Sequence, residues 1–401
     1  MTRDYDIIVW GASGFTGKLV TAYLATEQAA SNLKWAVAGR NVEKVRQTLG
    51  EYDIPIIHAD SEDQASIEAL VQQTRVILTT VGPYARYGSG LVAACAAHGT
   101  HYCDLTGEVH WMREMISAHQ ASAVASGARL VHTCGFDSIP SDMGVYFLQQ
   151  QMLAKHGVPA QQIKFRLRGT SGGVSGGTID SMMAMVEEAR EDKTILKQLA
   201  DPYVLNDSSR GTDGPERMSA FFDDDFDAWV GPFVMAGVNT KVVRRSNELL
   251  AHQYGTDFQY SEGTLTRRGA GGFLGATGLG VGSGAVAALV SLGPTRSLLQ
   301  KVLPKPGEGP SEDAINNGYF HIEMLGKHPS DPSKNMRVEV KGDKDPGYGS
   351  TAKMIAESAL ALAQDELTIG GGFWTPASAL GDSLLRRLPQ SAGVTFDVLE
   401  G

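Results

Sequence analysis

The sequence predicts an α/β protein with a doubly wound parallel sheet in residues 1–145, followed by a second α+β domain with a mixed or antiparallel sheet. Three observations support this fold class. An apolar run that starts close to Met1 leads into a glycine-rich turn. Short apolar runs, each followed by a segment of helical length, then recur as far as residue 133. Beyond residue 145 the apolar residues instead alternate with polar ones, as in half-exposed strands.

The first of these elements is the apolar run 6–10 with the turn that follows it. Its glycines are spaced G-x-x-G-x-x-G at Gly11, Gly14 and Gly17, between a strand and a helix. Gly11 allows a tight turn, Gly14 lets backbone N–H groups approach a pyrophosphate, and Gly17 allows close packing of the helix. The context predicts a dinucleotide-binding loop of the Rossmann type, and the alternative is a structural turn without a ligand. The loop residues expected to contact the cofactor are Gly11, Ser13, Gly14, Phe15, Thr16 and Gly17.

The second strand, 33–38, bears on which nucleotide binds. It ends in Gly39 and Arg40, with Lys44 one helical turn later, where sites for NAD commonly carry a carboxylate for the ribose 2′-hydroxyl. A guanidinium suits a 2′-phosphate instead, so we expect NADP(H) rather than NAD(H). The alternative is that Arg40 is a solvated loop residue and the site does not discriminate.

The third and fourth strands, 55–59 and 76–81, provide the next contacts. The third ends at Asp60, which is expected either to meet the adenine or to cap a helix that starts near Asp63. The fourth runs into Val81, Gly82 and Pro83. Ligands of such sheets bind beyond the carboxyl ends of the strands, so these three residues should lie near the nicotinamide ribose.

Two further strands, 101–103 and 128–133, complete six strand–helix repeats and lead into polar loops. Candidate catalytic residues on the strand-end loops are Tyr84, Asp104 and Asp137, with Tyr87, Glu108 and Ser138 as further donors or acids. Each has a structural alternative: the tyrosines could pack over the cofactor, and Asp104, Asp137 and Ser138 could cap helices.

These motifs resemble a known family. The glycine loop, the run 81–84, the run 104–108 and the run 135–142 are similar to those of the saccharopine dehydrogenase-like oxidoreductases. Within that family the branch with the mycobacterial trans-acting enoyl reductases is the most similar, and the runs 175–181 and 371–377 extend the resemblance over most of the chain. The resemblance implies an NADP-dependent oxidoreductase. It implies no particular catalytic residue.

The second half of the chain reads as a substrate domain, 146–345, and a C-terminal helical segment, 346–401, that returns to the nucleotide domain as in relatives. Alternating strands are expected at 162–169, 319–326 and 335–342, and helices at 179–200 and 351–363. The strands should form a mixed sheet that carries the substrate pocket and could offer a contact for a homodimer.

The segment 269–295 has no charged residue, although Arg267 and Arg268 precede it and Arg296 follows it. It is long enough for a bilayer core of about 30 Å, but its first half is rich in glycine, which weakens a helix in water. Three interpretations stay open: a loop with a buried helix, an element that dips into a membrane, and a true span.

Composition and charge argue against several classes of function. The net charge of −10 over 401 residues and the lack of a basic stripe argue against nucleic-acid binding. The three cysteines have no metal-type spacing and are interpreted as reduced thiols of a cytoplasmic protein, with catalysis by Cys103 or Cys134 as the alternative. The histidines show no metal-ligand pattern, and the polar start of the chain does not read as a signal peptide.

The sequence leaves three hypotheses about the function open. The first is reduction of a C=C bond in a lipid- or polyketide-type acyl group, free or bound to a carrier, as the branch implies. The second is an oxidoreductase reaction on an amino-acid-derived substrate, for which Arg166, Arg168, Arg244 and Arg245 could bind carboxylates. The third is a non-catalytic, lipid-associated protein that binds the nucleotide without turning it over.

Overall fold

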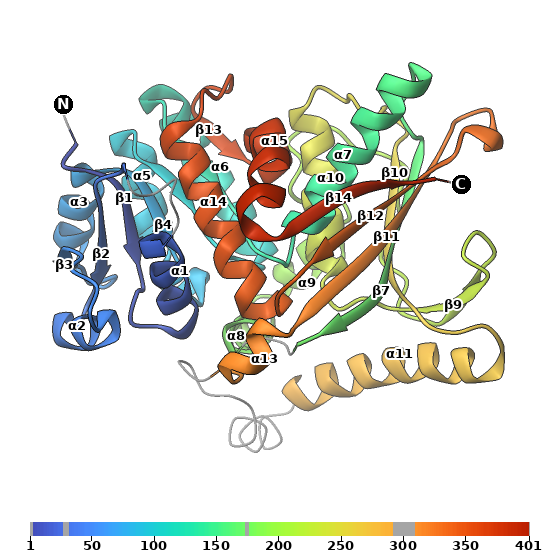
Figure 1. Ribbon diagram of the computed structural model, residues 1–401, viewed down its shortest axis with the longest axis horizontal. Helices are drawn as coiled ribbons and strands as arrows, with labels where there is room; N and C mark the ends of the chain where they lie inside the picture. The colour runs from blue at the N-terminus through green and yellow to red at the C-terminus, as the bar shows by residue number, and fades with distance from the viewer. Residues whose placement is uncertain (1–2, 27–31, 173–175, 292–308, 401) are drawn as a thin grey trace.

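A computed structural model describes residues 3–26, 32–172, 176–291 and 309–400. The chain forms two seven-stranded sheets with helices around them, and the N-terminus and C-terminus lie at opposite ends of the molecule (Figure 1). Parts of two segments named in the sequence analysis, the run 175–181 and the segment 269–295, fall outside the described residues.

Sheet A contains the strands predicted in the first domain. Its order is β13-β6-β5-β4-β1-β2-β3, and the recorded pairings are all parallel. Its strands are β1 (Tyr5–Trp10), β2 (Trp35–Gly39), β3 (Ile56–His58), β4 (Thr74–Thr79), β5 (His101–Cys103), β6 (Arg129–Val131) and β13 (Gly372–Trp374). Six of them were predicted, and the seventh comes from the last part of the chain.

Helices cover both faces of sheet A, which explains why its strands are apolar on both sides. In β1, Ile7 and Val9 join the core under α1 (Phe15–Thr26), α2 (Val42–Leu49) and α14 (Thr351–Gln364). Ile8 and Trp10 join the opposite core, under α3 (Gln64–Gln73), α5 (Ser89–His98) and α6 (Val109–Ser126). The predicted doubly wound parallel arrangement is confirmed.

Sheet B is mixed, with the order β14-β12-β11-β7-β10-β9-β8. Only β10 and β7 pair in parallel among its recorded pairings. Its strands are β7 (Gln162–Ser171), β8 (Phe221–Asp223), β9 (Ala228–Gly231), β10 (Gln259–Leu265), β11 (Tyr319–Lys327), β12 (Met336–Gly342) and β14 (Val394–Leu399). Helices α7 (Ile139–His156), α10 (Ala236–Leu249) and α15 (Pro376–Arg387) lie beside one face (Figure 1).

Two differences from the sequence prediction concern helices and the C-terminal segment. The single helix expected at 179–200 is two helices, α8 (Gly176–Glu191) and α9 (Lys193–Ala200), because the Asp192 side chain caps α9 by accepting from Thr194 N. The segment 346–401 contains strands as well as helices, and it adds β13 to sheet A and β14 to sheet B. It therefore ties the two sheets together. The proposed domain boundaries near residues 145 and 345 stay predictions.

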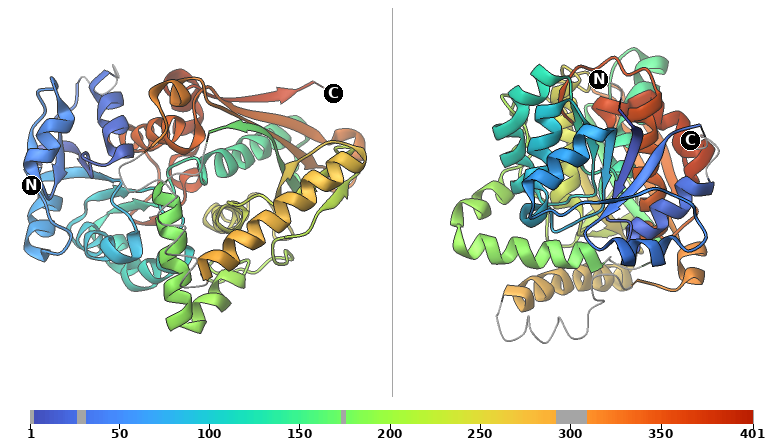
Figure 2. Two further views of the ribbon diagram at one scale, coloured as in Figure 1. Left: turned by 90° about the horizontal axis from the view of Figure 1, so that it is seen from below. Right: turned by 90° about the vertical axis from the view of Figure 1, so that its left-hand side faces the viewer.

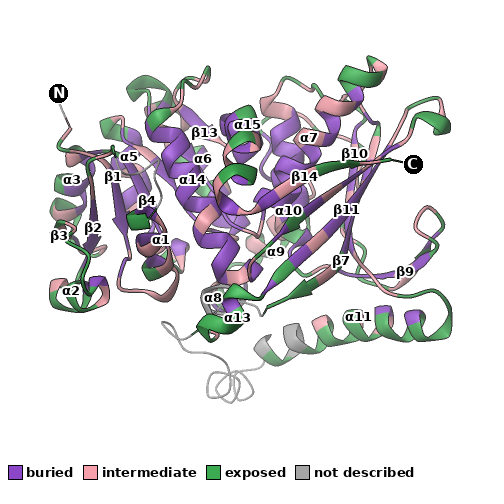
Figure 3. Ribbon diagram, viewed as in Figure 1, coloured by how far each residue is buried: buried purple, intermediate pink, exposed green. Residues whose placement is uncertain are grey.

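The remaining helices lie outside these layers. Helix α4 (Tyr84–Tyr87) follows β4, α13 (Glu312–Asn316) precedes β11, and α11 (Gly269–Ser291) follows β10. Helix α11 lies along one side of the molecule, near α8, and most of its ribbon is exposed (Figures 2 and 3).

Candidate cofactor site and active site

The glycine loop after β1 is a tightly closed turn. Gly11 has a φ of +102°, and a Cβ atom there would lie 2.7 Å from Thr80 Oγ1. The N–H of Gly14 donates to Gly11 O at 2.9 Å. A Cβ atom on Gly17 would lie 2.1 Å from the same oxygen, so Gly17 permits close packing of α1 on the turn itself. The N-terminus of α1 thus lies at the carboxyl edge of sheet A, where its free backbone N–H groups and the helix dipole favour the binding of an anion.

Two cations lie at the same edge beside β2. Arg40 follows the strand directly and is exposed, and Lys44 is exposed in the first turn of α2. Asn41 caps that helix by accepting from Lys44 N at 2.9 Å. Because β2 pairs with β1, these side chains stand next to the glycine loop, where a 2′-phosphate could reach them.

The ends of β3 and β4 complete this edge. Asp60 is half-buried, and its carboxylate accepts from Glu62 N at 3.1 Å, so it belongs to a local turn, and its contact with adenine stays a prediction. Val81 and Pro83 are half-buried and Gly82 is exposed, with a cis peptide bond between Gly82 and Pro83. All three follow β4, the central neighbour of β1 in sheet A.

Asp104 is fully buried at the end of β5. One carboxylate oxygen accepts from Thr133 N and Thr106 N at 3.0 and 3.1 Å. The other accepts from Tyr102 Oη at 2.9 Å and lies 2.7 Å from His132 Nδ1. Asp104 does not cap α6, whose N-cap residue is Glu108. Both of its oxygens are engaged within the protein, where they fasten the ends of β5 and β6 to each other.

Tyr84 is also buried. Its hydroxyl donates to Thr79 O at 3.2 Å and accepts from Leu105 N at 3.1 Å, and burial raises its pKa well above the usual value. The Tyr84 N–H donates to Glu108, which also accepts from Ser181 Oγ at 2.8 Å. The side chains of Tyr84 and Glu108 therefore join neighbouring strand ends, and their catalytic roles stay predictions.

Asp137 differs from these residues. It is half-buried on the loop between β6 and α7, and its carboxylate makes no hydrogen bond or ion pair within the part of the chain that the structure describes. Burial raises its pKa to about 6. A carboxyl group in this condition can hold a proton near neutral pH and deliver it.

Apolar side chains gather around this loop. Phe136 lies 5.0 Å from Phe320, measured between ring centroids, and a Cβ atom on Gly135 would lie 2.8 Å from Leu105. Phe233, which packs against the same apolar core as Leu105 and Phe136, stacks on Phe165 with ring centroids 5.5 Å apart. Leu105, Phe136 and Phe233 are half-buried, so part of each side chain remains accessible. The surroundings of Asp137 suit an apolar ligand.

The four arginines considered as carboxylate clamps are all paired with acidic side chains. Arg166 is buried and donates to Asp223 at 2.7 and 3.0 Å, and the other pairs are Arg168 with Glu323, Arg244 with Asp213 and Arg245 with Asp207. Neutralised guanidinium groups of this kind offer little to a substrate carboxylate.

A buried polar network behind Asp137 was missed by the sequence reasoning. Ser138 Oγ donates to Asn239 Oδ1 at 3.2 Å, and Asn239 Nδ2 donates to Glu262 at 3.1 Å. Glu262 also accepts from Tyr260 Oη at 2.8 Å, and burial raises its pKa to about 7. The sequence signal for this network was Glu262, which occupies a buried position of the strand 259–265. The sequence analysis did not predict that strand.

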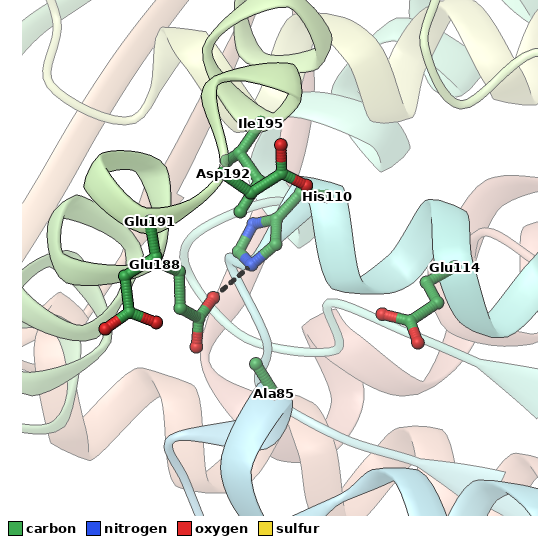
Figure 4. A pocket seen from close by; sticks show the side chains of 7 residues that line it. All are labelled: Ala85, His110, Glu114, Glu188, Glu191, Asp192 and Ile195. Atoms are coloured by element: carbon green, nitrogen blue, oxygen red, sulfur yellow. Dashed lines mark hydrogen bonds and ion pairs between the residues drawn. The ribbon is translucent and has the colours of Figure 1, made fainter.

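A separate pocket of about 260 Å³ lies between α6 and the α8–α9 pair (Figure 4). His110 Nε2 lies 2.7 Å from Glu188 Oε2 at its wall. The lining residues are Ala85, His110, Glu114, Glu188, Glu191, Asp192 and Ile195. An acidic lining does not suit nucleotide phosphates. In the described ranges no group of three or more His, Cys, Asp or Glu residues has the arrangement of a metal site.

The cysteines are free and buried. Burial raises the pKa of the Cys103 and Cys134 thiols, so the thiolate that nucleophilic catalysis requires is disfavoured. This weighs against the catalytic alternative for either residue.

The parallel sheet, the glycine loop at its carboxyl edge and the second mixed sheet are the features of a dinucleotide-binding α/β protein. Residues 7–131 match the family model described as the saccharopine dehydrogenase NADP binding domain. The chain belongs to the saccharopine dehydrogenase-like oxidoreductases, in the branch of the trans-acting enoyl reductases, and its cofactor is NADP(H).

Relatives of similar length support this assignment. A Mycobacterium tuberculosis protein with the provisional name trans-acting enoyl reductase is 40% identical over 98% of this chain and 97% of its own. The trans-acting enoyl reductase of Mycobacterium bovis is 38% identical with the same coverage. Saccharopine dehydrogenase (L-Glu forming) from Saccharomyces cerevisiae shares the fold, with a TM-score of 0.53 at 12% identity over 99% of this chain and 100% of that one.

Proposed function

We propose that the protein reduces a C=C bond of a lipid- or polyketide-type acyl group, free or bound to a carrier. The observation that carries this proposal is the Asp137 carboxyl group among half-buried apolar side chains at the carboxyl edge of sheet A. The names of the relatives at 38–40% identity support the same reaction.

When bound, NADPH supplies a hydride for the β-carbon of the unsaturated acyl group. The chain's own residues do the rest. Leu105, Phe136 and Phe233 hold the apolar chain and keep water from the reacting carbons. The electron pair of the C=C bond moves to the α-carbon and its carbonyl, and Asp137 gives its proton to the α-carbon. Because Asp137 is only half-buried, its carboxylate regains a proton from solvent.

We also propose that Arg40, supported by Lys44, selects NADPH over NADH. Both side chains are exposed at the end of β2, and a 2′-phosphate between them would gain charge-assisted hydrogen bonds that NADH cannot make.

Two alternatives are weaker. An amino-acid-derived substrate needs cations for its carboxylates, and the four arginines of the second domain already pair with acidic side chains. A binding protein without turnover would have no use for a partly protonated, accessible carboxyl group at the cofactor edge.

The test follows NADPH consumption with 2-enoyl thioesters of increasing chain length and, in parallel, with an amino acid plus a 2-oxo acid. We expect consumption with the longer enoyl thioesters, and a saturated product that carries deuterium on its β-carbon when deuterated NADPH is used. Consumption only with the amino-acid pair would favour the second function. Tight NADPH binding without consumption across both panels would favour the third.

A further inference from the structure

Helix α11 exposes an apolar surface that the oxidoreductase function does not require. Its 23 residues, Gly269–Ser291, include no charged side chain. Leu274 and Val281 are 68% and 67% exposed, and Phe273 is 43% exposed. The helix runs along the lower edge of the molecule in Figure 1, and its ribbon is largely exposed in Figure 3.

The described part of α11 packs mainly on β9, and the helix also contacts α8. Phe273 meets Trp229 of β9 edge to face, with ring centroids 4.8 Å apart. A Cβ atom on Gly231 of β9 would lie 2.9 Å from Ala276 O. Gly272 and Ala276 are buried along this side. Leu274 and Val281, by contrast, are exposed.

The composition of α11 is poorly suited to water. Eight of its residues are glycine, and each glycine in a solvated helix costs about 1 kcal/mol relative to alanine. In an apolar medium water does not compete for the backbone hydrogen bonds, and glycine is frequent in helices of membranes. Within the described residues no helix is both long enough and apolar enough to cross a bilayer.

Cationic side chains stand beside this apolar surface. Arg267 and Arg268 directly precede α11 and are exposed, and Arg268 pairs with the exposed Asp227. Arg217 is exposed next to Met218, whose carbonyl would lie 2.9 Å from a Cβ atom on Gly280 of α11. In a lipid surface, the guanidinium groups could pair with the headgroup phosphates, and the apolar side chains of the helix could contact the acyl chains.

We propose that α11 is a monotopic membrane element, which lies in the boundary between the headgroups and acyl chains of a lipid bilayer. Leu274 and Val281 enter the acyl region, and Arg217, Arg267 and Arg268 stay at the level of the phosphates. This inference does not depend on the cofactor or the substrate, so it can fail while the proposed reaction holds, and the reverse.

The experiment is flotation of the full-length protein with phosphatidylcholine vesicles, with and without phosphatidylglycerol. The test variant is Leu274→Glu/Val281→Glu. The control is Val124→Glu/Leu153→Glu, which adds the same charge at apolar side chains that are 55% and 38% exposed on α6 and α7. NADPH titration and circular dichroism establish that each variant is folded.

We expect the wild type and the control to float with vesicles, more strongly when phosphatidylglycerol is present, and the test variant to lose at least tenfold in vesicle affinity. Failure of the wild type to float with either vesicle would overturn the proposal, and so would unchanged binding of the test variant. A lipid-free dimer that the test variant converts to a monomer, without vesicle binding by the wild type, would assign this surface to a second copy of the chain instead.

Discussion

Asp104 and Asp137 show how residues of one type at neighbouring strand ends acquire different roles. Asp104 accepts from two backbone N–H groups and binds two side chains, so its charge is satisfied within the protein. Asp137 has no such partner among the described residues, and its pKa rises to about 6. The sequence placed both at the cofactor edge but could not rank them, because hydrogen-bond partners from other segments decide the difference.

Replacing Asp137 tests its role as the proton donor. A general acid acts in its protonated form, so we expect kcat/KM of the wild type to be constant below about pH 6 and to fall above it. Asp137→Asn should lower kcat about 10²–10⁴-fold, abolish this pH dependence and leave the Kd of NADPH unchanged. Asp53→Asn, at an exposed loop position, is the control. If the Asp137→Asn enzyme kept the same fall in kcat/KM above pH 6, this role would be excluded.

Replacing Arg40 tests its role in the choice between NADPH and NADH. A hydrogen bond to a charged group contributes about 1.5–3 kcal/mol, so Arg40→Ala should weaken NADPH binding about ten- to a hundredfold and NADH binding little. Fluorescence titration with both nucleotides measures this. Arg46→Ala, an exposed arginine in the last turn of α2, should change neither affinity. Equal losses for both nucleotides in Arg40→Ala would refute the assignment to the 2′-phosphate.

At the scale of elements, the first domain was predictable and the second was only partly so. In sheet A each strand is a short apolar run before a helix, so six strands and the glycine loop followed from local pattern. Strands β8 and β9 have three and four residues, too few for a clear alternation. Strand β13 has three residues and takes its place from pairing with β6, more than 200 positions earlier. No local pattern encodes such a pairing.

The glycine loop permits a sharp comparison between two substitutions. A Cβ atom on Gly17 would lie 2.1 Å from Gly11 O, whereas a Cβ atom on Gly14 would lie 3.3 Å from the same oxygen. Gly17→Ala should therefore force the turn and α1 apart, at a cost of about 1–3 kcal/mol, and lower Tm by several degrees. Gly14→Ala should change the Tm of the cofactor-free protein much less. Thermal unfolding without cofactor distinguishes the two, and equal Tm values would show that the turn relaxes freely.

At the scale of the whole molecule, buried carboxyl groups lie where the two halves meet. Asp142 on α7 accepts from Ser246 of α10 at 2.5 Å and from Ala377 N at the start of α15 at 2.8 Å, and burial raises its pKa to about 7. Glu262 on sheet B binds Asn239 of α10, and its pKa also rises to about 7. These contacts join sheet B to the helices that link it to sheet A. The sequence did not predict them, because each depends on segments brought together only by the fold.

Glu262 makes the stability of the whole protein depend on pH. Between its ordinary value of 4.5 and about 7, the folded protein holds a proton that the unfolded chain has released. The free energy of unfolding therefore falls as the pH rises through this window, by at most about 1.4 kcal/mol per pH unit for one group. Glu262→Gln should remove the contribution of Glu262 and make the slope smaller, while Asp142 and Asp137, whose pKa values are also raised, keep theirs. Chemical denaturation at pH 5, 6 and 7 would measure the change in slope.

Glu248→Gln provides a control of opposite sign. Desolvation acts against the charge of Glu248, but the N–H groups of Asp207, Ser208 and Ser209 outweigh it and lower its pKa to about 2. Its stabilisation is complete above about pH 4.5 and is lost only as the pH falls toward 2, so Glu248→Gln should lower stability by a similar amount at pH 5, 6 and 7. If Glu262→Gln keeps the wild-type slope, then Glu262 is ionised in the folded protein, and Asp142 or Asp137 must account for any slope that is measured.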